Sequence, residues 1–217
     1  MNPKLEKALK RLKKVLPLKE KQQECNQEIK TLHQNILFSF VTTGRMPTKE
    51  EMAQHVSDLD EALRVLKEKE LVVFSENGTP IGAYPFTMEE REHKVFVNGH
   101  QVYAMCALDA LAISPMFGMK THITSQCRAS NAVVEVKQST MEIENLSEVD
   151  ELHVGILWGA ADTDTSCANS LCMEMIFLNN NKTAQQWYAV DVENREVFTL
   201  EEAVEFARAF FVPVISS

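Results

Sequence analysis

The chain has 217 residues, of which 45% are hydrophobic and 24% are charged. This composition is typical of a folded globular protein and excludes a disordered tail, a collagen-like fibre and a low-complexity linker. The 22 basic and 31 acidic residues give a net charge of −9. This negative charge argues against a protein whose main role is to bind nucleic acid. No apolar run approaches the roughly 18–20 residues that span a bilayer, and no apolar stretch follows the basic N-terminus as in a secretory signal.

The N-terminal segment is basic, unlike the rest of the chain. Residues 1–21 hold eight basic and two acidic residues, so they carry +6 and the other 196 residues carry −15. Leucines recur at helical spacing over residues 3–21 with lysines on the other face, which predicts an amphipathic helix that Pro17 ends. We expect this helix to dock on its own protein, and binding to a membrane surface or to an anionic partner is the alternative.

Three more helices are predicted next. Residues 22–44 carry an apolar stripe at helical spacing, and Gly44 is expected to end that helix. Thr48 and Glu51 form a T-x-x-E capping box that predicts the start of a short helix. Ser57 is expected to open a further helix with its apolar side facing inward.

Apolar runs on both sides of Asn77-Gly78 predict a β-hairpin. Helices followed by a two-stranded wing are the order of a winged-helix module, so residues 1–85 are predicted to form a winged-helix-like domain that includes the basic helix. Sequence-specific DNA binding is one hypothesis for it. The helix that follows Ser57 begins with Asp58-Leu59-Asp60-Glu61, and these carboxylates would be repelled by phosphate groups. We therefore expect a structural or lid role and no nucleic-acid partner.

The second predicted domain covers residues 86–217 and has α+β character. It begins with a second hairpin around Asn98-Gly99. Residues 170–178 are ambiguous between helix and strand. Helices are predicted over residues 106–117, with a disturbance at Ser114-Pro115, and over residues 183–190. A third helix is predicted to begin at the capping box Thr199–Glu202 and to end at about Phe211. Strands are predicted over residues 122–126, 132–137 and 153–158. The predicted architecture is a mixed, mainly antiparallel sheet with flanking helices.

The five cysteines are odd in number and are not spaced like a small disulfide scaffold. We therefore expect reduced thiols and a cytoplasmic protein. No two form a C-x-x-C pair, which disfavours a zinc ribbon. Cys167 and Cys172 are an alternative soft-metal pair, and Cys25 is expected to be incidental.

Other common catalytic patterns are missing from the sequence. The six histidines are scattered, with no i, i+4 pair of the metalloprotease kind. Seven glycines leave little material for a phosphate-binding loop, and there is no serine nucleophile elbow. Phosphoryl transfer, dinucleotide chemistry and serine hydrolysis are therefore disfavoured.

Cys106 and Asp109 lie three residues apart at the start of a predicted helix, which places both on one face. A helix N-terminus favours negative charge, so we expect it to lower the pKa of Cys106 and to supply a thiolate. A thiolate beside a carboxyl group tends to share one proton with it. Such a pair suits a reaction in which a thiol loses a proton and a carboxylic acid later donates one. The alternative is a buried cysteine beside an aspartate that complements the helix dipole.

The sequence from Tyr103 to Leu111, Y-A-M-C-A-L-D-A-L, resembles the Y-A-W-C-A-L-D-T-L motif of the alkylmercury lyase (organomercurial lyase) family. Further segments fit the same family, clearest over residues 81–187: Gly82-Ala-Tyr, the S-x-C that ends at Cys127, Ser170-Leu-Cys172 and Trp187. Met105 stands where the family has a tryptophan, Leu171 stands where it has a phenylalanine, and Cys167 has no obvious counterpart.

This resemblance implies that Cys106 and Cys172 are the two catalytic cysteines that bind mercury, with Asp109 as the catalytic aspartate and a further possible ligand. It implies a structural role for Cys127. Soft thiolates are the preferred ligands of a soft ion such as Hg(II). Two thiolates on an organomercurial make its carbon basic, and a nearby carboxylic acid can protonate it. The expected products are a hydrocarbon and Hg(II).

The resemblance also implies an organomercurial small-molecule substrate and no organic cofactor. Low-molecular-weight thiols, and a mercuric reductase as a further partner, would remove the Hg(II). Three alternatives remain at this point: a thiolate protein that binds mercury or copper without cleavage, a metal-responsive winged-helix regulator, and a thiol redox protein.

Overall fold

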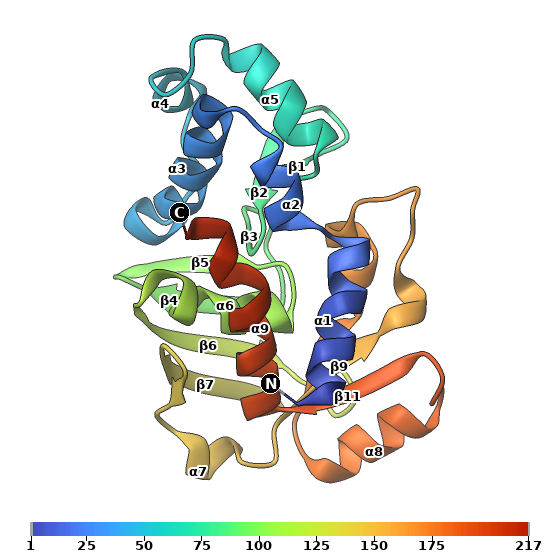
Figure 1. Ribbon diagram of the computed structural model, residues 1–217. Coiled ribbons are helices and arrows are strands. Elements are labelled where there is room, and N and C mark those ends of the chain that lie inside the picture. The colour runs from blue at the N-terminus through green and yellow to red at the C-terminus, as the bar shows by residue number, and fades with distance from the viewer. Residues whose placement is uncertain (1, 217) are drawn as a thin grey trace.

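The computed structural model describes residues 2–216 and contains two antiparallel sheets with helices packed around them (Figure 1). Eight strands form the larger sheet in the order β1-β2-β3-β5-β4-β6-β7-β8, and three form the smaller one in the order β10-β9-β11. The strands are β1 (Val73–Phe74), β2 (Pro80–Ala83), β3 (Phe86–Thr87), β4 (His93–Val97), β5 (His100–Ala104), β6 (Lys120–Gln126), β7 (Val133–Ser139), β8 (Glu142–Ile143), β9 (His153–Leu157), β10 (Met175–Leu178) and β11 (Arg195–Thr199).

The helices complete an α+β architecture, which confirms the predicted fold class. The strands form two sheets in which every pairing is antiparallel, whereas one mixed sheet was predicted. The helices are α1 (Pro3–Val15), α2 (Leu18–Gln23), α3 (Gln27–Thr43), α4 (Lys49–Ala53), α5 (Leu59–Glu68), α6 (Ala107–Phe117), α7 (Leu146–Val149), α8 (Asn181–Ala189) and α9 (Leu200–Ile215), with short 3-10 turns at Trp158–Ala160, Cys167–Asn169 and Leu171–Glu174.

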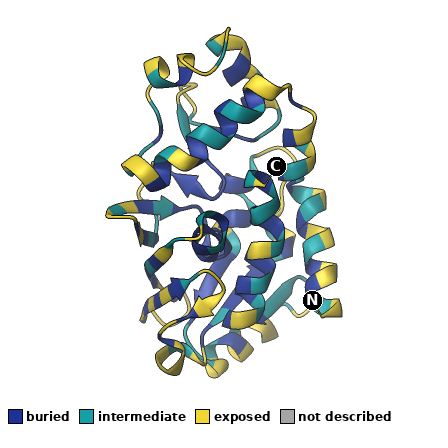
Figure 2. Ribbon diagram, turned by 60° about the vertical axis from the view of Figure 1, so that its left-hand side comes forward, coloured by how far each residue is buried: buried dark blue, intermediate teal, exposed yellow. Residues whose placement is uncertain are grey.

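Helix α6 is the centre of the core. It contacts strands of both sheets and packs along α9, which lies beside α1 in Figure 1. Apart from Pro115 and Phe117, every residue of α6 is buried. Figure 2 shows the buried residues gathered between the layers and the exposed residues on the outer faces of the peripheral helices. The side chains at the start of α6 are therefore almost completely buried.

The predicted N-terminal helix ends just before Pro17, as expected, but the residues after Pro17 that the prediction also assigned to it form a second helix. α1 ends at Val15, and Pro17, which cannot donate a backbone hydrogen bond, precedes α2. The buried side of α1 faces α9, and Lys4 Nζ lies 2.8 Å from a carboxylate oxygen of Glu202. The basic segment thus docks on its own protein.

Two helices, α3 and α5, begin later in the chain than predicted, for the same physical reason. α3 begins at Gln27 instead of residue 22, because the Asn26 side chain accepts the backbone N–H of Ile29. α5 begins after Asp58 instead of Ser57, since Asp58 caps the backbone N–H of Glu61. In both cases a short polar side chain satisfies an otherwise unpaired N–H group. The predicted end of α3 is confirmed, with Gly44 in the left-handed conformation at φ 74°.

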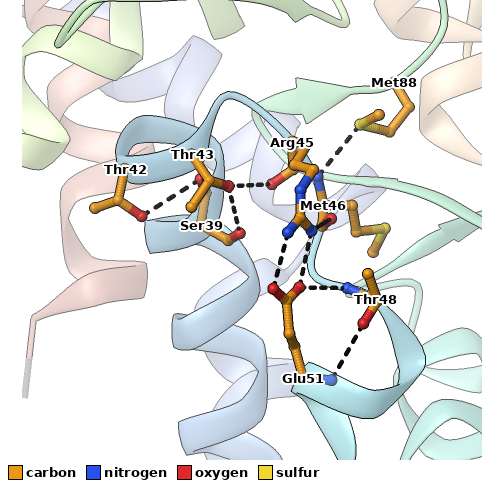
Figure 3. Close-up of polar contacts among 8 residues, drawn as sticks. All are labelled: Ser39, Thr42, Thr43, Arg45, Met46, Thr48, Glu51 and Met88. Atoms are coloured by element: carbon orange, nitrogen blue, oxygen red, sulfur yellow. Dashed lines mark hydrogen bonds and ion pairs between the residues drawn. The ribbon is translucent and has the colours of Figure 1, made fainter.

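The capping box at the start of α4 is confirmed and is reinforced by an arginine (Figure 3). The Glu51 carboxylate accepts the backbone N–H of Thr48 at 2.7 Å and both terminal nitrogens of Arg45 at 2.8 Å. Hydrogen bonds from Arg45 and from the Thr48 backbone lower the pKa of Glu51 to about 2. In the same close-up, the backbone N–H of Met46 points to the Met88 sulfur, 3.3 Å away. These contacts join the helical segment to the chain beyond β3.

The larger sheet continues across the predicted domain boundary at residues 85 and 86. β2 pairs with β3 on the other side of that boundary, with Gly82 opposite Thr87 and Ala83 opposite Phe86. A Cβ atom on Gly82 would lie 2.4 Å from the Phe86 carbonyl oxygen, so glycine permits this close approach. The predicted wing, β1 and β2, is thus one end of the large sheet, and the division into two domains and the winged-helix assignment stay predictions.

The C-terminal part differs from the prediction in several places, and it contains β8 and α7, which were not predicted. The ambiguous residues 170–178 form a 3-10 turn followed by β10. Strand β11, with its mixed charged and apolar residues, was not predicted. Helix α9 continues beyond Phe211 to Ile215 and includes Pro213. Within residues 2–216, no helix is both long and apolar enough to cross a membrane.

Candidate active site

Cys106 and Asp109 are positioned by the direct passage from β5 into α6. Cys106 is the N-cap residue of α6, with extended backbone angles, and its Sγ atom accepts the backbone N–H of Asp109 at 3.3 Å. This hydrogen bond does for a thiol what a serine hydroxyl does at other helix starts. It turns both side chains to the same face of the helix, as the spacing of three residues predicted.

Cys172 reaches the same place from the other sheet. It lies in the 3-10 turn Leu171–Glu174, which leads into β10. The Sδ atom of Met175, the first residue of β10, lies 3.6 Å from Cys106 Sγ. Because β10 packs against α6, the turn holds Cys172 over the start of that helix.

The two thiols and the carboxyl group converge. The Sγ atoms of Cys106 and Cys172 and a carboxylate oxygen of Asp109 all lie within 4.8 Å of one another. All three residues are buried, with exposures of 1% for Cys106, 1% for Asp109 and 3% for Cys172. Within residues 2–216 this is the one cluster of three or more histidine, cysteine or acidic side chains with metal-binding geometry. The site brings two soft ligands and one acid to a single point.

The Asp109 carboxyl group is poised between its two protonation states at neutral pH. Burial raises the pKa of Asp109 to about 7, while the neighbouring Cys106 thiol and, to a smaller extent, the positive charge of Arg91 oppose that rise. Neither carboxyl oxygen has a hydrogen-bond partner among the described residues. A carboxyl group that is left unpaired in a buried site is uncommon, and such groups cluster where chemistry occurs.

Both thiols hold their protons. Burial raises the pKa of Cys106 to about 12. The neighbouring sulfur atoms of Cys106 and Cys167, together with burial, raise the pKa of Cys172 well above its ordinary value. The expectation that the start of α6 lowers the pKa of Cys106 is therefore wrong, because the loss of water around the sulfur outweighs the helix dipole. A proton must leave each thiol when it binds a metal.

The other cysteines fall into two groups. Cys167 lies beside the site, with its Sγ atom 3.6 Å from that of Cys172. Cys127 is fully buried at the end of β6, where its backbone closes the loop to β7 through hydrogen bonds with Ala132 and Asn131. Cys25 is buried near α2 and donates to the Lys21 carbonyl oxygen. All five cysteines are free thiols.

Two residues from the first 85 positions of the chain, Glu70 and Tyr84, hold the turn that carries Cys167 in place. The Glu70 carboxylate accepts the backbone N–H of Cys167 at 2.6 Å and the Tyr84 hydroxyl at 3.1 Å. The Tyr84 oxygen in turn accepts the backbone N–H of Ala168 at 2.9 Å. Glu70 has a φ of 55°, an uncommon angle for a residue with a side chain. Strain of this kind persists where surrounding contacts hold a residue in place, and here it aims the carboxylate at the cysteine turn.

A pocket of about 530 Å³ adjoins the buried cluster. Its lining includes Met105 and Met173, the chain neighbours of the two site cysteines, together with Arg91. Arg91 donates to the Ala168 carbonyl oxygen at 2.9 Å and to Asn169 Oδ1 at 3.3 Å. Sequence reasoning missed both Arg91 and Glu70, since nothing in their neighbourhood marks them apart from other charged surface residues.

Comparison with known proteins points to one family. The family model described as MerB, alkylmercury lyase, matches residues 86–212. The alkylmercury lyase of Staphylococcus epidermidis is 27% identical over 163 residues, which cover 75% of this chain and 73% of that protein. The alkylmercury lyase of Bacillus cereus is 25% identical over 173 residues, which cover 79% of this chain and 77% of that protein.

A solved structure has the same fold. The crystal structure described as the mercury-bound form of MerB2 superposes with a TM-score of 0.73 at 17% identity, over 92% of this chain and 98% of that one. The sequence resemblance is thus confirmed by the family match and the relatives, and the architecture by the structural neighbour. Since the family match spans more than half of the chain, this protein belongs to the alkylmercury lyase family.

Proposed function

We propose that this lyase cleaves the carbon–mercury bond by protonolysis, with Cys106 and Cys172 as the mercury ligands and Asp109 as the group that delivers the proton. The observation that carries the proposal is the convergence of two thiols and one unpaired carboxyl group within 4.8 Å in a buried site. Two soft ligands and an acid are the groups that this reaction needs.

The proton balance follows from the pKa values. The substrate enters as an organomercurial bound to an external thiol, and Cys106 displaces that thiol while passing its own proton to it. Asp109, whose pKa is about 7, accepts the proton of Cys172 as this second sulfur binds mercury. Asp109 then returns the proton to the carbon atom as the carbon–mercury bond breaks. The products are a hydrocarbon, Hg(II) on two thiolates and one external thiol, so atoms and charges balance.

Burial supports this order of events. Because Asp109 is 1% exposed, bulk solvent does not compete freely for its proton, which goes to the basic carbon atom beside it. Arg91 opposes the rise in the pKa of Asp109 and so stabilises the carboxylate that exists before the first proton transfer and after the second. The reaction as written uses no organic cofactor.

The pocket suggests the route of the substrate. Met105 takes the place of the family's tryptophan, and its flexible side chain lines the pocket beside Cys106 together with Met173. We propose that organomercurials enter there, that low-molecular-weight thiols remove the product, and that a mercuric reductase is a further acceptor. The need for free thiols supports a reducing cytoplasmic setting. Cys127 is proposed to act in packing alone.

Hydrocarbon release tests the proposal. The purified chain is incubated with methylmercury and excess thiol, and methane is measured in the headspace. Cys106→Ser and Cys172→Ser should each abolish release, whereas Cys25→Ser should release methane as the natural chain does. Tight mercury binding by the natural chain without any methane would favour the alternative of a non-catalytic thiolate protein.

A further inference from the structure

Cys167 is a third thiol at the site, and neither cleavage nor the family pattern uses it. We propose that Cys167 receives the Hg(II) product from Cys106, so that the metal moves to a second pair of thiolates, Cys167 and Cys172. The proposal rests on the proposed function, because Cys106 and Cys172 must first hold the product.

The geometry makes Cys172 the sulfur shared by two pairs. On one side it forms the cluster with Cys106 and Asp109, within 4.8 Å. On the other side its Sγ atom lies 3.6 Å from Cys167 Sγ. Both Cys167 and Cys172 are 3% exposed, so no external thiol reaches either sulfur freely. A metal on Cys172 therefore has one internal thiol available on each side.

The position of Cys167 is fixed through its backbone. Its N–H group donates to Glu70 at 2.6 Å, and the next N–H group, of Ala168, donates to Tyr84. Two adjacent N–H groups are thus held by side chains that come from outside the turn. This arrangement keeps the third sulfur beside Cys172. Because the turn is already ordered, it loses little conformational freedom when a metal binds.

The two thiol pairs lie next to different openings. Met105 and Met173, the neighbours of Cys106 and Cys172, line the pocket of about 530 Å³. Ser166, the neighbour of Cys167, lines a separate pocket of about 440 Å³, whose wall includes Glu70 and the exposed residues Thr163 to Thr165. Transfer to Cys167 would therefore bring the product toward an opening other than the one proposed for the substrate.

The transfer is a balanced ligand exchange. The Cys167 sulfur forms a bond to Hg(II) as the bond between mercury and Cys106 breaks. The proton of the Cys167 thiol passes to the departing Cys106 sulfur, which becomes a thiol again. Mercury stays in the same oxidation state with two thiolate ligands, and no further reactant is needed. Cys106 and Asp109 regain their resting protonation before the metal leaves the protein.

The experiment uses Hg(II) added directly, so it needs no carbon–mercury cleavage. Cys106→Ser is loaded with one equivalent of Hg(II) under a phosphine reductant, and the metal is stripped with increasing concentrations of glutathione. The double variant Cys106→Ser/Cys167→Ser is compared with it, and Cys106→Ser/Cys25→Ser is the control for removing a buried thiol elsewhere. Circular dichroism checks that each chain is folded.

We expect the double variant without Cys167 to release Hg(II) at a glutathione concentration about 10²-fold lower, because a two-point attachment becomes a single one. The Cys25 control should release it at the same concentration as Cys106→Ser. Equal release with and without Cys167 would overturn the proposal. Independently of the double variant, anomalous scattering from crystals of mercury-loaded Cys106→Ser should place the metal between the sulfurs of Cys167 and Cys172, and a metal without contact to Cys167 would overturn it.

These outcomes are separable from a failure of the proposed function. Methane release by the natural chain reports on cleavage alone, whereas retention of added Hg(II) in the absence of Cys106 reports on the second thiol pair alone.

Discussion

Replacement of Asp109 by asparagine should stabilise the protein against unfolding in a pH-dependent way. The carboxyl group of an unfolded chain ionises near pH 3.8, whereas burial holds the proton of Asp109 until about pH 7. The folded state of the natural chain therefore loses stability as the pH rises from about 4 to 7, and the loss persists above pH 7. It amounts to about 2 kcal/mol at pH 5 and about 4 kcal/mol at pH 8, at roughly 1.4 kcal/mol for each pH unit.

The amide of an asparagine cannot ionise, so the Asp109→Asn chain lacks this loss. Urea denaturation, followed by tryptophan fluorescence at pH 5 and at pH 8, measures the free energy of unfolding of both chains. The cost of burying an amide is the same at both pH values and cancels in the comparison. The stability gap between the variant and the natural chain should therefore grow by about 3 kcal/mol from pH 5 to pH 8. A gap that stays constant would refute the raised pKa, and Cys25→Ser serves as the variant without any expected pH effect.

The same substitution should separate binding from cleavage. Asp109→Asn keeps both thiols, so it should still bind an organomercurial, but it cannot pass a proton to carbon and should release no methane. In the natural chain the carboxylate form of Asp109, which must accept the Cys172 proton, becomes rarer below pH 7, so methane release should weaken there. Methane release by Asp109→Asn at the rate of the natural chain would show that the proton comes from another group.

The remaining predictions concern the residues that support the site. Gly82→Ala should destabilise the fold by about 1–3 kcal/mol in urea, because the added Cβ meets the Phe86 carbonyl oxygen at 2.4 Å; unchanged stability would mean that β2 shifts freely. Cys127→Ser should cost about 1–3 kcal/mol through an unpaired buried hydroxyl, while methane release per folded chain stays constant; the reverse pattern would give Cys127 a chemical role. Glu70→Ala should lower kcat for methane release by loosening the cysteine turn, and Glu70→Gln should restore it, since an amide oxygen accepts the same N–H group; no rescue would remove the positioning role.

Helical spacing in the sequence predicted the part of the site whose residues are close together in the chain, Cys106 and Asp109. The approach of Asp109 to Cys106 follows from helical spacing alone, and the structure adds the hydrogen bond at the start of α6. The position of Cys172 came from the family resemblance, because no spacing rule relates residues so far apart. The approach of Cys167 to Cys172 depends on a pair of 3-10 turns that carry no apolar period.

Burial explains the main error about the site. The helix dipole at Cys106 is visible in the sequence, but its effect on the pKa depends on how much water surrounds the sulfur. That quantity is set by β10 and by the packing of α6 in the core, and neither follows from the motif. Errors in the fold have a similar origin, since Asn26 and Asp58 compete with nearby residues as helix caps and only the folded chain decides between them.

The hydrogen bonds from the cysteine turn to Glu70 and Tyr84 limit how this protein can be divided or recombined. The segment that matches the family model begins at residue 86, after both of these side chains. A truncated chain that kept only that segment would carry every reactive group and yet leave the backbone N–H groups of Cys167 and Ala168 without their acceptors. Exchange of the first 85 residues between relatives should therefore succeed only when the donor segment brings a carboxylate and a hydroxyl to the same two N–H groups.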